Sequence, residues 1–157
     1  MSEIDIDELR KNFGRRLRIG FIGGGRDSVI GGTHLAAMRV DGFFELYAGV
    51  FSIDPTVSEA TARAEFLDAD RVYKSFNEMA EKEALREDGI EVVLIAAPPH
   101  IHFEAAKVFL TKGIDVICEK PIAVSREQAS QLDDLAQQQS RLSVSYTHLR
   151  AHETQRY

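Results

Sequence analysis

Short apolar runs alternate with longer amphipathic stretches along the chain. The runs that look buried on both faces span 17–23, 44–52, 90–97 and 114–120, with weaker candidates at 71–75 and 141–146. Uninterrupted apolar runs of this length are typical of parallel strands that have helices on both faces. The alternation therefore predicts an α/β fold assembled from βαβ units.

The stretches between these runs predict helices with recognisable ends. Apolar residues recur at helical spacing in 32–39, 57–66, 76–86, 102–111 and 126–139. Asp54 stands before Pro55, which places a capping side chain ahead of a proline in the first helical turn. Ser75 and Glu78 have the spacing of a capping box, and Gly113 is a typical stop. We expect the helices to cover both faces of a doubly wound, mostly parallel sheet in the strand order 3-2-1-4-5-6.

Composition limits the partners that are compatible with the chain. Its 157 residues, 44% of them hydrophobic, suffice for one buried core, and no repeat or low-complexity linker marks a second domain. A net charge of −6 argues against nucleic acid and anionic membranes as partners. No stretch approaches the roughly 18 apolar residues that a membrane span needs, so we expect a cytoplasmic protein. The single cysteine, Cys118, lies in an apolar run and is expected to be buried and inert.

The segment LRIGFIGGGRDSVIGGTH, residues 17–34, joins the first predicted strand to the first predicted helix through a glycine-rich turn. In this context glycines let the backbone approach a pyrophosphate, and the start of the helix favours its negative charge. Gly23 and Gly25 occupy the first two positions of the usual fingerprint. The third glycine position of the fingerprint falls to Gly31 or Gly32, because the segment RDSVI is inserted before it. We expect the helix to begin near Gly31. An ordinary turn and an S-adenosylmethionine site of methyltransferase type are the alternatives.

The second predicted strand ends at Ser52, where dinucleotide-binding folds commonly place an acid that contacts the adenosine ribose. The nearest acid is Asp54, which we interpret as the cap of the next helix. Ser52 could tolerate a 2′-phosphate, but no arginine stands beside it in the sequence. The choice between NAD and NADP therefore stays open.

Two further strand ends carry residues suited to chemistry. The fourth predicted strand ends in AAPPHIHFEAA and the fifth in VICEKPIAVS. Ligands of open α/β sheets bind beyond the carboxyl ends of the strands, so both segments should flank the same crevice as the glycine turn. His100 and His102 could suggest a metal, but the spacing supplies no third ligand, and we expect none.

The glycine-rich first turn, the proline-containing HxH loop and the EKP tripeptide, in this order, resemble the Gfo/Idh/MocA family, the glucose-fructose oxidoreductase and inositol dehydrogenase group. The resemblance extends from about Arg15 to Leu142 and is most specific in GIDVICEKPIAVSREQA. It implies an NAD(P)-binding Rossmann domain over 15–143, preceded by an extension over 1–14. It also implies a C-terminal domain, absent from this chain, that closes the substrate site and through which the parent forms homo-oligomers.

The resemblance implies roles for individual residues. Lys120 would be the catalytic lysine beside the nicotinamide and the substrate oxygen, Glu119 would contact the nicotinamide ribose, and Pro121 would follow a peptide bond that is often cis in such enzymes. The other implied cofactor-binding residues are Gly23, Gly25, Ile30, Gly31, Ser52, Ala97, Pro98 and His102. A lysine ammonium suits the stabilisation of a developing alkoxide better than proton removal, so the general acid or base would lie in the absent domain.

Other positions depart from the family pattern or have a plain structural interpretation. The family usually has asparagine after the proline, where this chain has Pro99, which removes an amide side chain and an N–H donor. His34 is expected to pack or cap on the first helix rather than contact substrate. Residues 144–154 resemble a translated sequencing-library adaptor, which predicts a non-native tail over 144–157. Val144 and Tyr146 could still complete the last strand because of their β-propensity.

Together these features predict the dinucleotide-binding portion of an NAD(P)-dependent oxidoreductase that transfers hydride between nicotinamide and a hydroxyl or carbonyl group of a sugar, cyclitol or polyol. The portion alone is expected to be inactive. One alternative is a non-catalytic NAD(H)-sensing module, which would not need Lys120. The other is the methyltransferase, in which the EKP tripeptide has no place.

Overall fold

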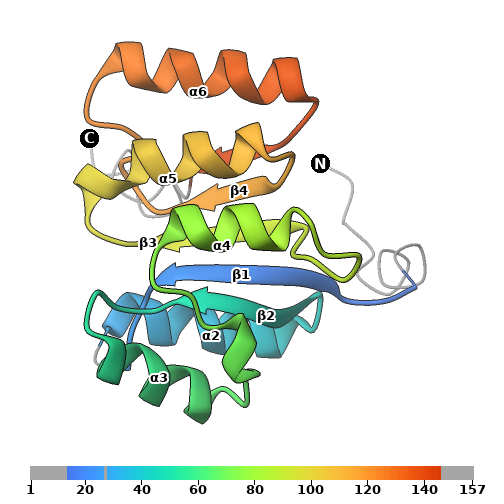
Figure 1. Cartoon of the computed structure of the whole chain (residues 1–157). Helices are drawn as coiled ribbons and strands as arrows, with labels where there is room; N and C mark the ends of the chain where they lie inside the picture. Colours follow the sequence, from blue (N-terminus) through green and yellow to red (C-terminus); the bar gives the residue numbers. More distant parts are fainter. Residues whose placement is uncertain (1–13, 27, 146–157) are drawn as a thin grey trace.

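The computed structural model describes residues 14–26 and 28–145, which form a five-stranded sheet. The strands stand in the order β2-β1-β3-β4-β5, and every neighbouring pair is parallel. Their bounds are β1 (Leu17–Gly23), β2 (Phe44–Val50), β3 (Val92–Ala96), β4 (Asp115–Cys118) and β5 (Ser143–Ser145). The arrows of β1, β2 and β4 point the same way in Figure 1, so their carboxyl ends share one edge of the sheet.

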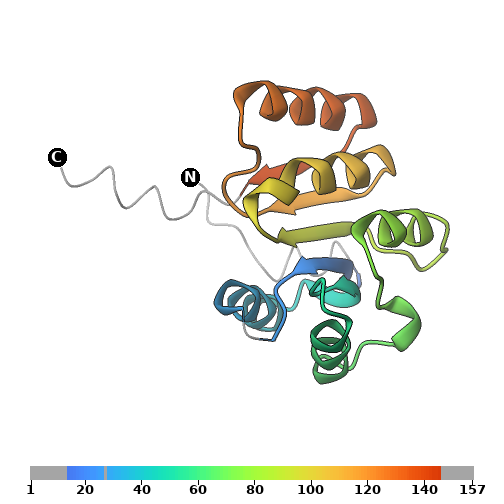
Figure 2. The same cartoon turned by 60° about the vertical axis from the view of Figure 1, so that its left-hand side comes forward.

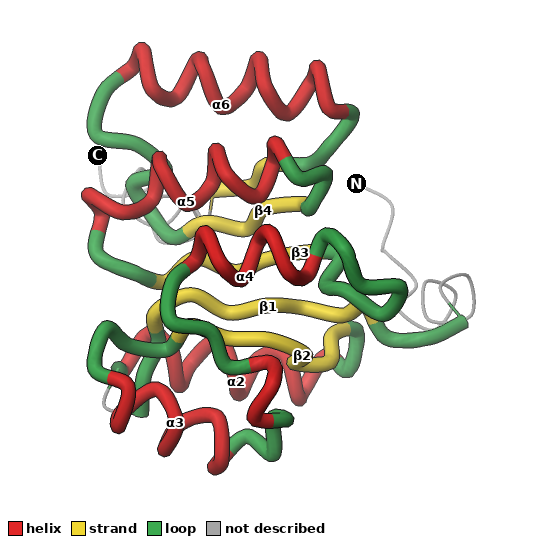
Figure 3. Tube along the Cα trace, in the orientation of Figure 1, coloured by secondary structure: helices red, strands yellow, loops and turns green. Residues whose placement is uncertain are grey.

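Helices cover both faces of this sheet. They are α2 (Val29–Asp41), α3 (Pro55–Ala64), α4 (Phe76–Glu83), α5 (Pro99–Thr111) and α6 (Arg126–Gln139). Figure 1 and Figure 3 show α4 and α5 in front of the sheet and α2 behind it. The turned view in Figure 2 separates α2 and α3 from the row of α4, α5 and α6. The predicted doubly wound α/β fold is confirmed.

The central strands send side chains into two separate apolar cores. Ile19 and Phe21 of β1 pack with Leu35 of α2 on one face, whereas Ile22 belongs to the cluster that includes Phe109 of α5 on the other. All of these side chains are buried. Because both faces are covered, the strands need apolar residues at consecutive positions, which explains the uninterrupted runs in the sequence.

The predicted six-strand order is one strand too long. In place of a strand at 71–75, the chain forms a short 3₁₀ helix, η1 (Ala69–Arg71), and a single isolated bridge between Val72 and Gly49. Ser75 already caps α4, since its hydroxyl accepts an N–H of the first turn at 3.2 Å, so only Tyr73 and Lys74 lie between the bridge and this cap. The other five strands keep the predicted order.

Capping side chains set where the helices begin. Asp54 caps α3 by accepting the Thr56 N–H at 2.8 Å, which confirms its interpretation as a cap. Helix α2 begins before the predicted Gly32, because the Ser28 hydroxyl accepts the Gly31 N–H at 3.0 Å. Within the described ranges, no helix is both long and apolar enough to cross a membrane.

The two ends of the chain leave predictions open. Residues 1–13 and 146–157 lie outside the described residues, and with them lie most of the predicted N-terminal extension and most of the predicted non-native tail. Val144 belongs to β5 and pairs with Ile117 of β4, as anticipated, whereas Tyr146 lies outside the described residues.

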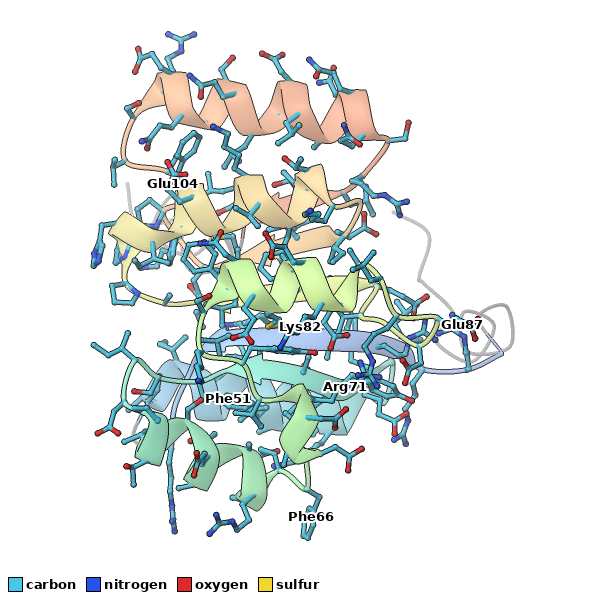
Figure 4. All side chains as sticks on the ribbon, viewed as in Figure 1. Phe51, Phe66, Arg71, Lys82, Glu87 and Glu104 are labelled. Atoms are coloured by element: carbon cyan, nitrogen blue, oxygen red, sulfur yellow. The ribbon has the colours of Figure 1, made fainter. Side chains whose placement is uncertain are left out.

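A charge network of the buried Arg71, Tyr73 and Glu83 and the exposed Asp88 joins η1, α4 and the approach to β3. Arg71 Nη1 lies 2.7 Å from Glu83 Oε2, and the Tyr73 hydroxyl donates to Glu83 Oε1 at 2.5 Å. Arg71 also pairs with Asp88, and the Ile90 N–H donates to Glu83 Oε2 at 3.1 Å. Burial, and after it the bond to Glu83, raises the pKa of Tyr73 and keeps its hydroxyl a donor. Figure 4 labels Arg71 between α4 and η1.

Candidate functional site

A cleft of about 1120 Å³ opens at the carboxyl-terminal ends of β1, β2, β3 and β4. Most of the residues predicted for the site line this cleft, and they come from four different segments: Gly23, Ile30, Ser52, Ala97, Pro98, His102, Glu119 and Lys120. Gly25, Gly31 and Pro121 do not line it. The structure therefore brings the predicted strand ends together at one site, which is where open α/β sheets bind ligands.

The glycine turn has room for backbone only. Gly23 has a φ of +80°, and a Cβ added there would lie 2.4 Å from the Ala96 carbonyl oxygen. A Cβ at Gly31 would lie 2.3 Å from the Cα of Gly24, whereas a Cβ at Gly32 would meet open space. Contacts this short exclude a side chain. Of the two candidates for the third glycine, Gly31 is thus the one that close packing of α2 on the turn requires.

The RDSVI segment belongs partly to the helix, so its interpretation as an inserted loop is wrong. Ser28 is the cap, and Val29 and Ile30 form the first turn of α2, which begins before the predicted Gly31. Ile30 is half exposed and lines the cleft. The N–H groups in the first turn of α2 have no helical carbonyl four residues before them to donate to, and that of Gly31 donates to the Ser28 hydroxyl. A pyrophosphate fits this cradle, because backbone N–H groups and the positive end of the helix favour an anion.

The end of β2 borders a second hollow of about 510 Å³, and Ser52, Ile53 and Lys74 line both this hollow and the cleft. Asp54 lines neither of them. Lys74 was not predicted for the site, because it comes from the segment after η1. The sequence signal that could have found Lys74 was the weak strand candidate at 71–75. A segment that pairs with β2 brings the residues that follow it close to the end of β2.

The tripeptide Glu119–Lys120–Pro121 follows β4 and lines the cleft through its first two residues. The Glu119 carboxylate makes a bond on each oxygen: His34 Nε2 lies 2.7 Å from Oε1, and the Lys120 backbone N–H donates to Oε2 at 3.2 Å. The Lys120 side chain is exposed, and within the described residues no acid pairs with its ammonium. The Lys120–Pro121 peptide bond is cis, as the resemblance implied.

The histidines near the cleft bind other parts of the protein. His102 is only 1% exposed; its Nδ1 lies 2.7 Å from the Pro121 carbonyl oxygen and its Nε2 lies 2.7 Å from the Ala97 carbonyl oxygen. His34 binds Glu119 across the cleft wall, a role that the expected packing or capping did not include. His100 is exposed on the first turn of α5. In the described part of the chain, no group of three or more His, Cys, Asp or Glu side chains could hold a metal.

Pro99 departs from the family pattern but suits its place in the fold. It is the first residue of α5, where a missing N–H has no helical partner to lose and the proline φ is already helical. Pro98 precedes it without a side-chain capping bond. Together with Ala97 and Ile101, these prolines make the cleft wall apolar where β3 ends.

Cys118 is fully buried at the end of β4. Burial, and after it the nearby Glu119, raises the pKa of its thiol to about 12. The thiol therefore stays protonated and supplies no nucleophile to the adjacent cleft, which confirms the prediction of an inert strand residue.

Known proteins resemble the chain in sequence and in structure. The family described as "Oxidoreductase family, NAD-binding Rossmann fold" matches residues 17–148. The uncharacterized oxidoreductase YfiI of Bacillus subtilis is 38% identical over 132 residues, which cover 83% of this chain and 34% of the relative. Levoglucosan dehydrogenase of Pseudarthrobacter phenanthrenivorans is 30% identical over 121 residues, which cover 76% of this chain and 30% of the relative.

A solved structure resembles the fold closely. It is the inositol dehydrogenase homolog from Azotobacter vinelandii complexed with NADH and myo-inositol, with a TM-score of 0.81 and 35% sequence identity. The match covers 84% of this chain and 35% of the solved one. The chain thus spans about a third of the length of these relatives.

Proposed function

Since the chain belongs to the Gfo/Idh/MocA oxidoreductase family, through its NAD-binding Rossmann fold, we propose that it supplies the dinucleotide-binding part of an NAD(P)-dependent dehydrogenase. The proposed substrate is a hydroxyl or carbonyl group of a sugar, cyclitol or polyol. The observation that carries the proposal is that the glycine turn and Lys120 line one cleft. A glycine turn alone supports nucleotide binding, whereas the lysine adds a group suited to act on a substrate oxygen.

The proposed cofactor position runs along the cleft from Ser52 to Lys120. The pyrophosphate would lie at Gly23, where only backbone can be accommodated, and at the start of α2. The adenosine ribose would lie near Ser52, and the nicotinamide ribose would lie near Glu119. The Glu119 carboxylate can still accept bonds from ribose hydroxyls, because it has about four acceptor positions and uses two of them here.

Lys120 would bind the substrate oxygen in the proposed reaction. When bound, the nicotinamide supplies the acceptor or donor of the hydride. The Lys120 ammonium would stabilise the negative charge on the oxygen, which develops as the hydroxyl proton leaves or, in the reverse direction, as hydride adds to the carbonyl carbon. The hydroxyl proton would leave to a base in the rest of the parent protein, because both nitrogens of His102 and the Nε2 of His34 already face protein oxygens.

The relatives support the substrate class: one is named levoglucosan dehydrogenase, and the solved homolog holds myo-inositol. Either NAD or NADP suits the proposal, because Ser52 leaves space for a 2′-phosphate and Lys74 beside it adds a positive charge. Assembly of the parent into homo-oligomers through its further domain also belongs to the proposal. So does a cytoplasmic location, which the single cysteine supports, since Cys118 is buried and has no disulfide.

Ligand titration of the chain tests the proposal. We expect the fluorescence of NADH or NADPH to change in a saturable way on addition of the chain, and ADP to compete for the same site. S-adenosylmethionine should neither compete nor bind. Binding of S-adenosylmethionine without any binding of a reduced nicotinamide cofactor would contradict the proposal and favour the methyltransferase.

A further inference from the structure

Lys120 is the middle residue of a segment that histidines hold on both sides. This lysine segment, Glu119–Pro121, has His34 of α2 bound to its first side chain and His102 of α5 facing its last carbonyl oxygen. Both N···O distances are 2.7 Å. Helices α2 and α5 pack on opposite faces of the sheet, so the segment is held from two directions.

The pair of His34 and Glu119 links the helix after the glycine turn to the lysine segment. The two side chains are 14% and 16% exposed, so water competes little for the bond. The His34 and Phe21 rings also form a T-shaped pair, with ring centroids 6.4 Å apart. Because the second Glu119 oxygen accepts the Lys120 N–H, the position of His34 is transmitted to the backbone of Lys120 itself.

His102 links the end of β3 to the lysine segment. Its Nε2 faces the Ala97 carbonyl and its Nδ1 faces the Pro121 carbonyl. A carbonyl oxygen only accepts, so each ring nitrogen must donate to make its bond; a doubly protonated ring makes both bonds and a neutral ring makes one. With a carbonyl oxygen 2.7 Å from each ring nitrogen, His102 is placed to connect the two strand ends.

We propose that His34 and His102 are positioning residues of the dehydrogenase site: from two helices they hold the lysine segment so that the Lys120 ammonium meets the nicotinamide end of the cleft. This inference, which rests on the proposed function, assigns to His102 a role other than contact with the cofactor. Lys120 is exposed and has no ion-pair partner within the described residues, so its flanking residues determine where it stands. A displacement of about 1 Å can cost a reacting group roughly 100-fold in rate.

Amide side chains can replace the ring nitrogens one at a time. The amide nitrogen of Asn lies near the position of His Nδ1, and that of Gln lies near the position of Nε2. His102→Asn therefore keeps the bond to Pro121, and His102→Gln keeps only the bond to Ala97. A positioning role predicts that these two variants differ, whereas a role in packing alone predicts that both are impaired.

The other variants complete the set. His34→Gln keeps a donor for Glu119, and His34→Leu removes it. His100→Gln is the matched control, because His100 is exposed on the same helix as His102 and does not line the cleft.

Two ligands distinguish the two ends of the cleft. NADH reaches the lysine segment, whereas ADP ends at the glycine turn. We expect His102→Gln and His34→Leu to weaken NADH binding about tenfold and to leave ADP binding unchanged, because a buried partner loses its bond. His102→Asn, His34→Gln and His100→Gln should bind both ligands as the unaltered chain does. Hydrogen–deuterium exchange of the peptide 117–124 should rise in the first two variants only.

For each variant, the affinity for NADH is divided by the affinity for ADP. The proposal would be overturned if His102→Gln and His102→Asn gave the same ratio and the same hydrogen–deuterium exchange of the peptide 117–124. If neither the unaltered chain nor any variant binds NADH, the proposed function fails. Hydrogen–deuterium exchange alone then decides whether the two histidines hold the lysine segment. Thermal unfolding shows whether each variant folds. If both His102 variants are unfolded, the two His34 variants decide by the same measurements.

Discussion

The two ends of the sheet use charged side chains in opposite ways. At the amino-terminal ends of β1 and β3, the charges are paired: Arg15 Nη1 lies 2.7 Å from Glu91 Oε2, and Arg18 lies 3.8 Å from the same oxygen. Close by, Arg71 and Glu83 pair at 2.7 Å with side chains 5% and 0% exposed. These acids and bases satisfy one another and leave little charge for a ligand.

The carboxyl-terminal ends of the same strands are built differently. The turn after β1 is glycine and excludes side chains, as the contact at Gly23 shows. The segment after β4 has a cation, Lys120, that no acid pairs with among the described residues, and an acid, Glu119, that keeps acceptor positions. The difference indicates that the amino end stabilises the fold, whereas the carboxyl end keeps one cation and some acceptor positions of one carboxylate for a ligand.

Removing Glu83 tests this division most strongly. Glu83→Ala leaves the buried Arg71 guanidinium and the Tyr73 hydroxyl without their shared acceptor, so the free energy of unfolding should fall by about 3–5 kcal/mol. Urea denaturation measures this loss. Glu81→Ala on the same helix is the control, because Glu81 is exposed, and it should change little. A folded Glu83→Ala chain that no longer binds NADH would contradict the separation of the two ends.

Removing the Lys120 cation at the carboxyl-terminal end should have the opposite effect: activity should fall while stability is unchanged. Under the proposed function, Lys120→Met should lower the kcat of the parent dehydrogenase about 100-fold or more, because the charge that would develop on the substrate oxygen would lose its stabilising partner. In this chain the same substitution should leave the free energy of unfolding unchanged, since the side chain is exposed. Lys112→Met, at an exposed lysine outside the cleft, should alter neither quantity. A Lys120→Met parent with normal kcat would exclude the lysine from the reaction.

The glycine turn offers a matched pair of substitutions. Gly31→Ala places a methyl group against the backbone of Gly24, so it should cost about 1–3 kcal/mol of stability and weaken NADH binding more than tenfold. Gly32→Ala meets open space within the same helix and should raise stability by up to about 1 kcal/mol with unchanged binding. Denaturation and NADH titration of both variants measure the contrast. Equal behaviour of the two would mean that close packing at Gly31 is not needed.

Local patterns predicted the elements of the fold well where packing and sequence agree. β1 has the predicted bounds of 17–23, and α6 has the predicted bounds of 126–139, because a continuous apolar run and a long amphipathic stretch each favour one structure. The start of α2 was placed too late, since two adjacent glycines lower helix propensity there. The cap at Ser28 and the packing of the helix on the turn overcome that preference.

The candidate site was predicted less completely, because some of its residues come together only through the order of the strands in the sheet. The glycine turn and Lys120 each have a local motif, and both line the cleft. The bond between His34 and Glu119, and the approach of Lys74 to the end of β2, join residues far apart in the chain that share no motif. Only the order of the strands in the sheet brings them together.

The smallest expected effect is the pH dependence of the pair at the amino end. The hydrogen bond from Arg15 lowers the pKa of Glu91 from its ordinary 4.5 to about 2. Because the folded pKa lies below the unfolded one, this stabilisation is complete above about pH 4.5 and is lost as the pH falls toward about 2. Glu91→Gln should therefore lose about 1 kcal/mol near pH 7 and little near pH 2, a small value since Arg15 is half exposed. Urea midpoints across this range measure it. Loss of NADH binding by the folded variant near pH 7 would show that charge at the amino end does influence the cleft.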